Sequence, residues 1–429
     1  MVEFNSFDVT LVINYVITFI LLMMSVRNIG IAVNLLLMSA FSHNQLFRLD
    51  LYAGVVTSNA IIYVVLLLHL IRSRKAIFRF NYKYLSVVII VQLLLFIDAL
   101  FFKHFESGAL SDIAFIAIVY FYFDSSDKVI QSLKLLLVVS LLIALTGFLQ
   151  FLFGIYRGDF TVSGGVGGYL GNHVAFGFKT GLGALISLAL YQMTNEKKYL
   201  LVIVPLLAAL LISTARGPLV IVSLVLLLYV MVNLSFRQKA QLLIPVLLVI
   251  AIVSLSGFSG DIRSRFFNIV NVDVYNEKSI NTATSGRLVP YYAVLNIYKE
   301  HPWFGIGYRQ FSQQFYYYQS RLHFSRAQEF STHSVYLQYL AELGSVGLIC
   351  YILFLVYYFR NYSSIKARLK ENVTYETLLR FSGYGSLAYI LFGVFDNEGG
   401  FGDPSHVFYI ILPAVIMKIY TNESTLPNK

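Results

Sequence analysis

The feature of this chain that most restricts its fold is a succession of long apolar runs joined by mostly short polar connections. A helix that crosses a membrane needs about 20 mostly apolar residues, because the hydrocarbon core of a bilayer is about 30 Å thick. Only 13% of the residues are charged, whereas soluble domains carry about 25%. We therefore predict an all-α polytopic membrane protein with about 12–13 transmembrane helices. The apolar runs lie at 9–26, 29–43, 52–71, 84–101, 109–123, 129–153, 173–193, 199–213, 215–234, 241–257, 333–359, 378–397 and 405–420.

The distribution of Lys and Arg predicts the orientation. The connections rich in these residues are 72–83, 194–198, 235–240 and 360–377. The connections on the opposite side carry few, namely Arg48, Lys103 and Arg157. Because cytoplasmic loops hold the excess of positive charge, we expect the N-terminus outside and the C-terminus inside. The net charge of +10 then serves orientation and contact with anionic lipid headgroups, and it requires no nucleic-acid partner.

The termini and the cysteine usage add two expectations. The first eight residues have no basic region before the apolar run, so we expect no removable signal peptide. Cys350 is the single cysteine and lies inside an apolar run. An intrachain disulfide is therefore excluded.

One connection is much longer than the others. It divides the chain into N-terminal transmembrane helices (1–257), a large outer loop (258–332) and C-terminal transmembrane helices (333–429), all within one integral membrane domain. Loops of this length are either functional or disordered, and this one is rich in aromatic residues. It contains a predicted amphipathic helix, with Thr284 or Ser285 as its cap and Pro290 in its first turn. The expected apolar stripe of that helix is Leu288, Tyr291, Tyr292, Leu295 and Tyr298.

The segment STARGP (213–218) separates two apolar runs with almost no linker. We expect a tight junction in which Ser213 or Thr214 caps the following helix and Pro218 stands in its first turn. A helix N-terminus offers N–H groups and a partial positive charge, and Arg216 adds a fixed one, so the segment can bind an anion. The alternative is an arginine that reaches toward lipid headgroups.

Arg287 and His333 stand at two further helix starts. Arg287 follows Ser285 and Gly286, and its planar guanidinium suits a pyrophosphate, although it could also be a solvated loop residue. His333 opens a long apolar run and is either a base or a packing residue. From it, Leu337, Leu340, Gly344 and Gly347 follow at spacings of four and three, which predicts one shared face where glycines admit a neighbouring helix.

Weaker signals lie in the outer connections. The glycine-rich segment 163–173 is a candidate mobile loop, and FYYY (315–318) can stack on sugar rings or join an interfacial aromatic belt. Asp396, Glu398 and Asp403 are candidates for positioning an acceptor or are solvated turn residues. No HExxH or Asp-x-Asp motif indicates a metal.

Three segments carry a resemblance to a known family. THSVYLQYLAELGSVG (332–347) resembles the histidine motif of the O-antigen ligase and Wzy-type polymerase superfamily. His333, Ser334, Gly344 and Gly347 occupy its fixed positions. STARGP, with Arg216 and Gly217, is similar to the superfamily's Ser/Thr-x-Arg-Gly junction, and SGR followed by EHPWFGIGYRQF (300–311) is similar to its segment before the histidine. The resemblance covers roughly 199–350.

The resemblance implies a metal-independent glycosyltransferase of the GT-C type, without a cofactor, in the inner membrane of a bacterium. His333 would be the general base for the acceptor hydroxyl, and Arg216 and Arg287 would bind the departing pyrophosphate of an undecaprenyl-pyrophosphate-linked glycan. The site would face the periplasm or exterior, and displacement would invert the anomeric carbon. Expected partners are the lipid-linked donor and acceptor, membrane lipids and a chain-length regulator, with no nucleic acid.

Three functions remain open at this point. We favour a polymerase of lipid-linked repeat units because the long loop is rich in aromatic residues. A ligase would transfer finished glycan to lipid A core or to a protein. A lipid-linked oligosaccharide transporter would need ionisable groups inside its spans. Few such groups exist in the apolar runs, namely Asp98, Lys134, Lys179, Glu342 and Arg380.

Overall fold

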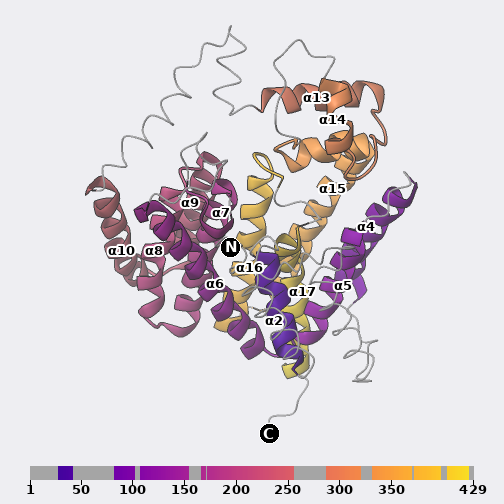
Figure 1. Ribbon diagram of the computed structural model, residues 1–429. Helices are drawn as coiled ribbons and strands as arrows, with labels where there is room; N and C mark the ends of the chain where they lie inside the picture. Colours follow the sequence, from indigo (N-terminus) through magenta and orange to yellow (C-terminus); the bar gives the residue numbers. More distant parts are fainter. Residues whose placement is uncertain are drawn as a thin grey trace, which may run out of the picture.

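The computed structural model of the chain is helical throughout its described part (Figure 1). It describes residues 28–41, 82–101, 107–153, 166–170, 172–255, 287–319, 331–369, 372–397 and 403–424. These residues contain no strand, which confirms the all-α prediction. The apolar runs at 9–26 and 52–71 and most of the basic connection 72–83 lie outside the described residues.

The described helices lie in the following order along the chain. They are α2 (Ile29–Phe41), α4 (Tyr82–Phe101), α5 (Ser107–Tyr122), α6 (Ser126–Phe153), the 3-10 helix η2 (Gly168–Leu170), α7 (His173–Thr194), α8 (Lys198–Ile212), α9 (Arg216–Asn233), α10 (Phe236–Leu255), α13 (Leu288–Glu300), α14 (Phe311–Gln319), α15 (Val335–Arg368), α16 (Val373–Phe392) and α17 (Pro404–Ser424).

Several of these helices have the length and composition of membrane spans. Five described helices are long and apolar enough to cross a membrane, namely α6, α7, α9, α15 and α17. Large apolar side chains are exposed along the outside of α9, such as Leu227 and Val232, where they are 58% and 68% exposed. An outer surface of this kind is stable against lipid and unstable against water. The protein is thus an all-α polytopic membrane protein.

The polar end of one predicted span is also helical. Hydropathy ends the run that follows His333 at residue 359, but α15 continues to Arg368, and α16 begins at Val373, so most of the predicted connection 360–377 is helix. Hydropathy detects only the part of a helix that would lie in the bilayer. It does not detect a helix that continues into water with polar residues such as Asn361 and Lys366.

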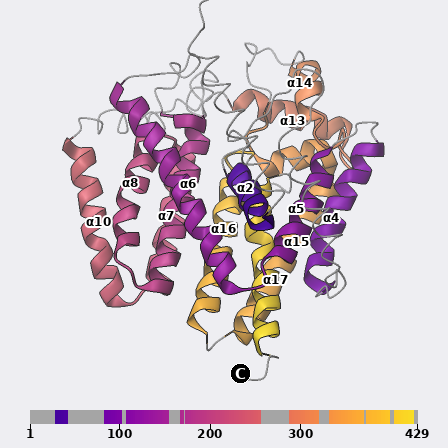
Figure 2. The ribbon, with the colours of Figure 1, turned by 60° about the horizontal axis from the view of Figure 1, so that its bottom comes forward.

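Helix α7 lies at the centre of one half of the bundle. It packs against α6, α8, α9 and α16, and almost all of its side chains are buried. Its glycines permit the close approach, because a Cβ on Gly181 would overlap Val222 of α9 and a Cβ on Gly183 would lie 2.7 Å from Ser140 Oγ of α6. Figure 2 shows α6, α7, α8 and α10 on one side and α4, α5 and α15 on the other, with α16 and α17 between them.

Helices α13 and α14 form a second, smaller core at one end of the bundle (Figure 1). The face of α13 that enters it consists of Val289, Ala293 and Ile297, with Pro290 and Val294 beside them. The stripe predicted from the sequence was therefore wrong. Its members Tyr292 and Leu295 are 37% and 46% exposed, and the small and β-branched residues spaced four apart pack against α14 and the start of α15 instead.

Helix α15 is broken at Gly344, whose φ of 65° and ψ of −164° are not helical. The prediction of a single face through Leu337, Leu340, Gly344 and Gly347 was wrong for this reason. Leu337 and Leu340 pack on the core of α13 and α14, whereas Gly347 lies beyond the break and packs against Leu343. The short first part of α15 therefore joins the outer core through Leu337 and Leu340 and the bundle core through Val335 and Tyr339, and the long second part belongs to the bundle.

Candidate functional site

The junction between α8 and α9 is as tight as the sequence predicts, but it is capped differently. Neither Ser213 nor Thr214 caps α9, because Ala215 holds the N-cap position and no side chain caps this helix. Ser213 Oγ instead donates to the Leu210 carbonyl at 2.6 Å and accepts from Ala215 N at 3.3 Å. Thr214 has a left-handed φ of 53°, which is uncommon for a β-branched residue. Pro218 stands in the first turn, as expected.

This geometry leaves polar groups at the start of α9 that can bind a ligand. The Thr214 hydroxyl is buried and has no hydrogen-bond partner. The N-cap residue Ala215 makes no side-chain capping hydrogen bond at this helix N-terminus, where N–H groups and the helix dipole favour an anion. Arg216, which is half-buried, is the first residue of the helix. A strained backbone and a buried hydroxyl without a hydrogen-bond partner, as at Thr214, are typical of functional sites.

Arg287 lies close to Arg216 although 71 positions separate them in sequence. The positive charges of the two residues are within electrostatic range of each other. Arg287 is the N-cap residue of α13, and its carbonyl accepts the Tyr291 N–H at 3.2 Å. The predicted caps Thr284 and Ser285 lie outside the described residues. Two half-buried cations that repel each other gain stability from an anion bound between them.

His333 does not open α15 but precedes it in a tight turn. The helix begins at Val335 with Ser334 as N-cap, and its Oγ accepts the Leu337 N–H at 3.5 Å. His333 itself has a left-handed φ of 49° and is half-buried. Its backbone N–H donates to Ser331 Oγ at 3.3 Å. The imidazole is thus carried by a strained turn that directly precedes α15.

Asn397 holds the turn of His333 in place. Its Nδ2 donates to Ser331 Oγ at 2.6 Å, and its Oδ1 accepts from the Thr332 hydroxyl at 2.8 Å. These bonds fix the residues on the N-terminal side of His333. The sequence analysis missed Asn397, although it lies in a polar cluster that separates the last two apolar runs.

The turn that follows α16 contacts both candidate segments. On the histidine side, Val335 N donates to the Gly393 carbonyl at 2.8 Å, and Ser334 Oγ donates to the same oxygen at 3.2 Å. On the arginine side, a Cβ on Gly217 would lie 3.2 Å from the Phe392 ring. That ring stacks on Phe178 of α7, with centroids 4.2 Å apart. The start of α9 and the turn of His333 therefore share one rigid support.

The segment from Pro302 to Gly307 encloses the break in α15. Ile306 N and Gly307 N donate to the carbonyls of Ala341 and Glu342, at 3.1 and 2.8 Å. In return, Ser345 N and Val346 N donate to the carbonyls of Pro302 and Trp303, at 2.8 and 3.2 Å. The backbone groups freed by the break are thus satisfied by the outer loop.

Three of the ionisable residues that a transporter could use, Asp98, Glu342 and Arg380, are engaged in fixed contacts. Asp98 of α4 accepts the Tyr308 N–H at 2.8 Å. Glu342 accepts from Phe311 N and from Gln338 Nε2, each at 3.2 Å. Arg380 pairs with Glu376 one turn away. These contacts hold helices and loops together.

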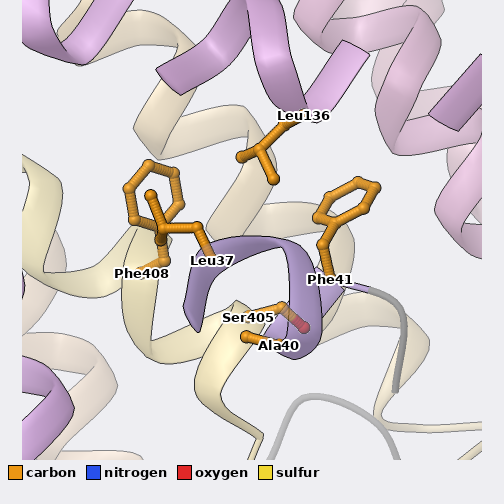
Figure 3. Close-up of a pocket in the computed structure, with 6 residues that line it drawn as sticks. All are labelled: Leu37, Ala40, Phe41, Leu136, Ser405 and Phe408. Carbon is orange, nitrogen blue, oxygen red and sulfur yellow. The ribbon is translucent and has the colours of Figure 1, made fainter. Parts of the chain in front are cut away.

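Lys179 is fully buried in α7 and joins two other helices. Its Nζ donates to Tyr389 OH at 2.8 Å and to Ser405 Oγ at 2.7 Å. It also lies 5.6 Å from the centre of the Phe41 ring. A small pocket adjoins this network and is lined by α2, α6 and α17 through Leu37, Ala40, Phe41, Leu136, Ser405 and Phe408 (Figure 3).

The weaker candidates from the outer connections do not come together in one site. Asp403 accepts from Ser405 N at 2.9 Å beside α17, and Glu398 lies outside the described residues. Of the aromatic run, Phe315 and Tyr318 are buried in the second core, whereas Tyr316 and Tyr317 are 55% and 58% exposed. Asn172, in the glycine-rich segment, caps α7 through its bond from Val174 N at 2.8 Å.

The described residues contain no group of three or more His, Cys, Asp or Glu side chains that could hold a metal ion.

Comparison with known proteins gives a match over part of the chain. A family model described as O-antigen ligase matches residues 201–352, from α8 to the second part of α15. The matched segment contains Arg216, Arg287 and His333. No curated protein matches the chain.

Proposed function

We propose that this chain, whose residues 201–352 match a family model described as O-antigen ligase, transfers glycan from undecaprenyl pyrophosphate to a sugar hydroxyl. One observation carries the proposal. Arg216 and Arg287 lie within electrostatic range of each other, and the helix start of Arg216 and the turn of His333 both rest on the turn after α16. This shared support is our reason for assigning the two arginines and His333 to one site.

The chemistry follows from these groups. Arg216, Arg287 and the N-terminus of α9 bind the pyrophosphate and stabilise the charge that it gains as a leaving group. The acceptor oxygen attacks the anomeric carbon from the opposite side, so the bond from that carbon to the phosphate oxygen breaks and its electron pair leaves with the pyrophosphate. His333 takes the proton of the acceptor hydroxyl, which a neutral imidazole can do near pH 7. The product has an inverted anomeric carbon.

Among the members of this class, we favour a polymerase that adds glycan to a lipid-linked repeat unit. The outer core offers exposed aromatic faces for sugar rings, since Tyr316 and Tyr317 are both more than half exposed. A ligase, with lipid A core or a protein as acceptor, would use the same arginines and histidine. We place the site on the periplasmic side of a bacterial inner membrane, because the Lys and Arg distribution puts the loop 258–332 outside.

The test is transfer by the purified full chain in lipid nanodiscs, with undecaprenyl-pyrophosphate glycan and EDTA. His333→Ala is expected to abolish elongation while the amount of folded protein stays unchanged. His301→Ala is the matched control, because His301 is exposed at the end of α13. Elongation by His333→Ala at the parental rate, or a need for a divalent metal in the parent, would show that the mechanism is wrong.

A further inference from the structure

An open polar pocket lies between α14 and the first part of α15. Its volume is about 390 Å³, within the range of pockets that hold small ligands. Its inner end is formed by Glu342 and Gln338, and its rim by Ser312 and Gln313 of α14. Neither Arg216 nor Arg287 lines it. The pocket is therefore distinct from the pair of arginines.

The lining identifies the chemistry of the ligand. It is dominated by amide and hydroxyl groups, such as those of Gln313, Gln338 and Asn397, which can both donate and accept hydrogen bonds. Arg309 is the one cation among the described lining residues, and it lies within electrostatic range of the Glu342 carboxyl group. A pyrophosphate would need an excess of positive charge. A polyhydroxylated and largely uncharged ligand, such as a sugar residue, matches this lining better.

The pocket is already shaped for a ligand. Both carboxylate oxygens of the buried Glu342 are engaged, one by Phe311 N and the other by Gln338 Nε2, each at 3.2 Å. Asn397, on the opposite wall, is tied to Ser331 and Thr332. Because these contacts fix the walls before any ligand enters, binding requires little ordering of the protein.

The pocket adjoins the turn of the candidate base. Ser331 and Thr332 line the pocket and directly precede His333, whose backbone N–H donates to Ser331 Oγ. A ligand in the pocket is thus next to the histidine turn. The two arginines do not line this pocket. The polar pocket, which suits hydroxyl groups, is therefore separate from the arginine pair, which suits phosphates.

We propose that this pocket is the acceptor site, which binds the terminal sugar of the acceptor glycan and presents its hydroxyl to His333. The inference rests on the proposed glycosyl transfer and names the residues that select the acceptor. Gln313 and Ser312 contact the sugar from the rim, and Gln338 and Asn397 contact it from the walls. Differences in these residues would change which sugar is accepted without changing donor binding.

The test measures acceptor and donor binding separately, with the full chain in nanodiscs. The acceptor probe is the oligosaccharide that mild acid releases from the lipid-linked glycan of the source cell. Since it carries no pyrophosphate, it cannot bind as a donor. The donor probe is undecaprenyl pyrophosphate. Gln313→Trp fills the pocket, and Gln313→Ala removes one amide. The controls are Leu295→Trp, which is exposed on α13 outside the pocket, and Gln314→Ala, whose side chain does not line it.

Gln313→Trp is expected to abolish oligosaccharide binding, and Gln313→Ala to weaken it by about tenfold, the loss that corresponds to one good hydrogen bond. Both variants should bind undecaprenyl pyrophosphate like the parent, and both controls should bind both probes like the parent. Parental affinity of Gln313→Trp for the oligosaccharide, or no binding of it by the parent, would overturn the acceptor site. Failure of the parent to bind undecaprenyl pyrophosphate would instead contradict the proposed function.

Discussion

Gly305 and Gly344 each pack against the backbone next to the other glycine. A Cβ on Gly305 would overlap the carbonyl of Glu342, and a Cβ on Gly344 would overlap the carbonyl of Trp303. Both glycines have positive φ, 66° and 65°. Four backbone hydrogen bonds surround this contact and join the outer loop to the two parts of α15. The reciprocal contact explains why glycine stands at both positions.

Gly344→Ala is therefore expected to loosen the joint between the outer core and the bundle. Its φ and ψ lie in a region that only glycine adopts readily, so the substitution should lower stability by about 1–3 kcal/mol. Trp303 is the single tryptophan of the chain, and its fluorescence reports this joint during thermal unfolding. Ile349→Ala, at an exposed position of the same helix, is the control. An unchanged unfolding temperature for Gly344→Ala would show that the joint is unimportant for stability.

Arg216→Lys and Arg287→Lys should each reduce glycan transfer by about tenfold to a thousandfold, because lysine keeps the charge but lacks the bidentate fork. Membrane insertion and the amount of protein should stay the same. The measurement is polymer formation in cells and transfer in nanodiscs. Arg360→Lys, on an exposed position of α15, is the control. If both lysine variants transfer glycan like the parent, the arginines do not recognise pyrophosphate directly.

Asn397→Ala should lower the transfer rate without changing the affinity for undecaprenyl pyrophosphate. The amide fixes Ser331 and Thr332 beside His333, and a displaced base loses rate steeply with distance. We expect a decrease of about tenfold or more. Asn361→Ala, which removes a bond to the Tyr357 carbonyl elsewhere on α15, is the control. Equal rates in the two variants would remove Asn397 from the site.

Labelling of single cysteines tests the orientation. Cys350 is exposed, so it is first replaced by alanine. An impermeant thiol reagent applied to whole cells should then label Ser279→Cys and spare Ser73→Cys, because the excess of Lys and Arg in 72–83 places that connection in the cytoplasm. Both positions lie outside the described residues. The reverse labelling pattern would place the loop 258–332 on the cytoplasmic side and contradict the site assignment.

The sequence predicts the helices well where one physical effect dominates. Apolar length alone locates α7, α8 and α9 to within a few residues, and the tight junction before Arg216 follows from the lack of polar residues between two runs. The outer helix α13 is also predicted. These features depend on hydropathy and on local backbone preferences, which are read directly from neighbouring residues.

The predictions that were wrong or missing concern contacts between residues far apart in the sequence. Spacing predicts one face from Leu337 to Gly347, but the loop at Trp303 enters α15 at Gly344 and breaks the helix. Ser213 has the side chain of a cap, but the close packing of Gly177 against it favours a bond within α8. Asn397 lies in a polar cluster, but nothing in that cluster indicates its partners, because its role arises only when α16 ends beside residues 331–334.

The turn after α16 has a consequence for exchange between related proteins. It lies outside the matched segment 201–352, yet Gly217 packs on Phe392, and Val335 is bonded to Gly393. A chimera that imports 201–352 from another protein matched by the same family model would retain the arginines and the histidine but would set them against a foreign support. An active chimera thus requires residues 392–397 from the same source protein as well. Recombination inside the matched segment alone should yield hybrid proteins that insert into the membrane but are inactive.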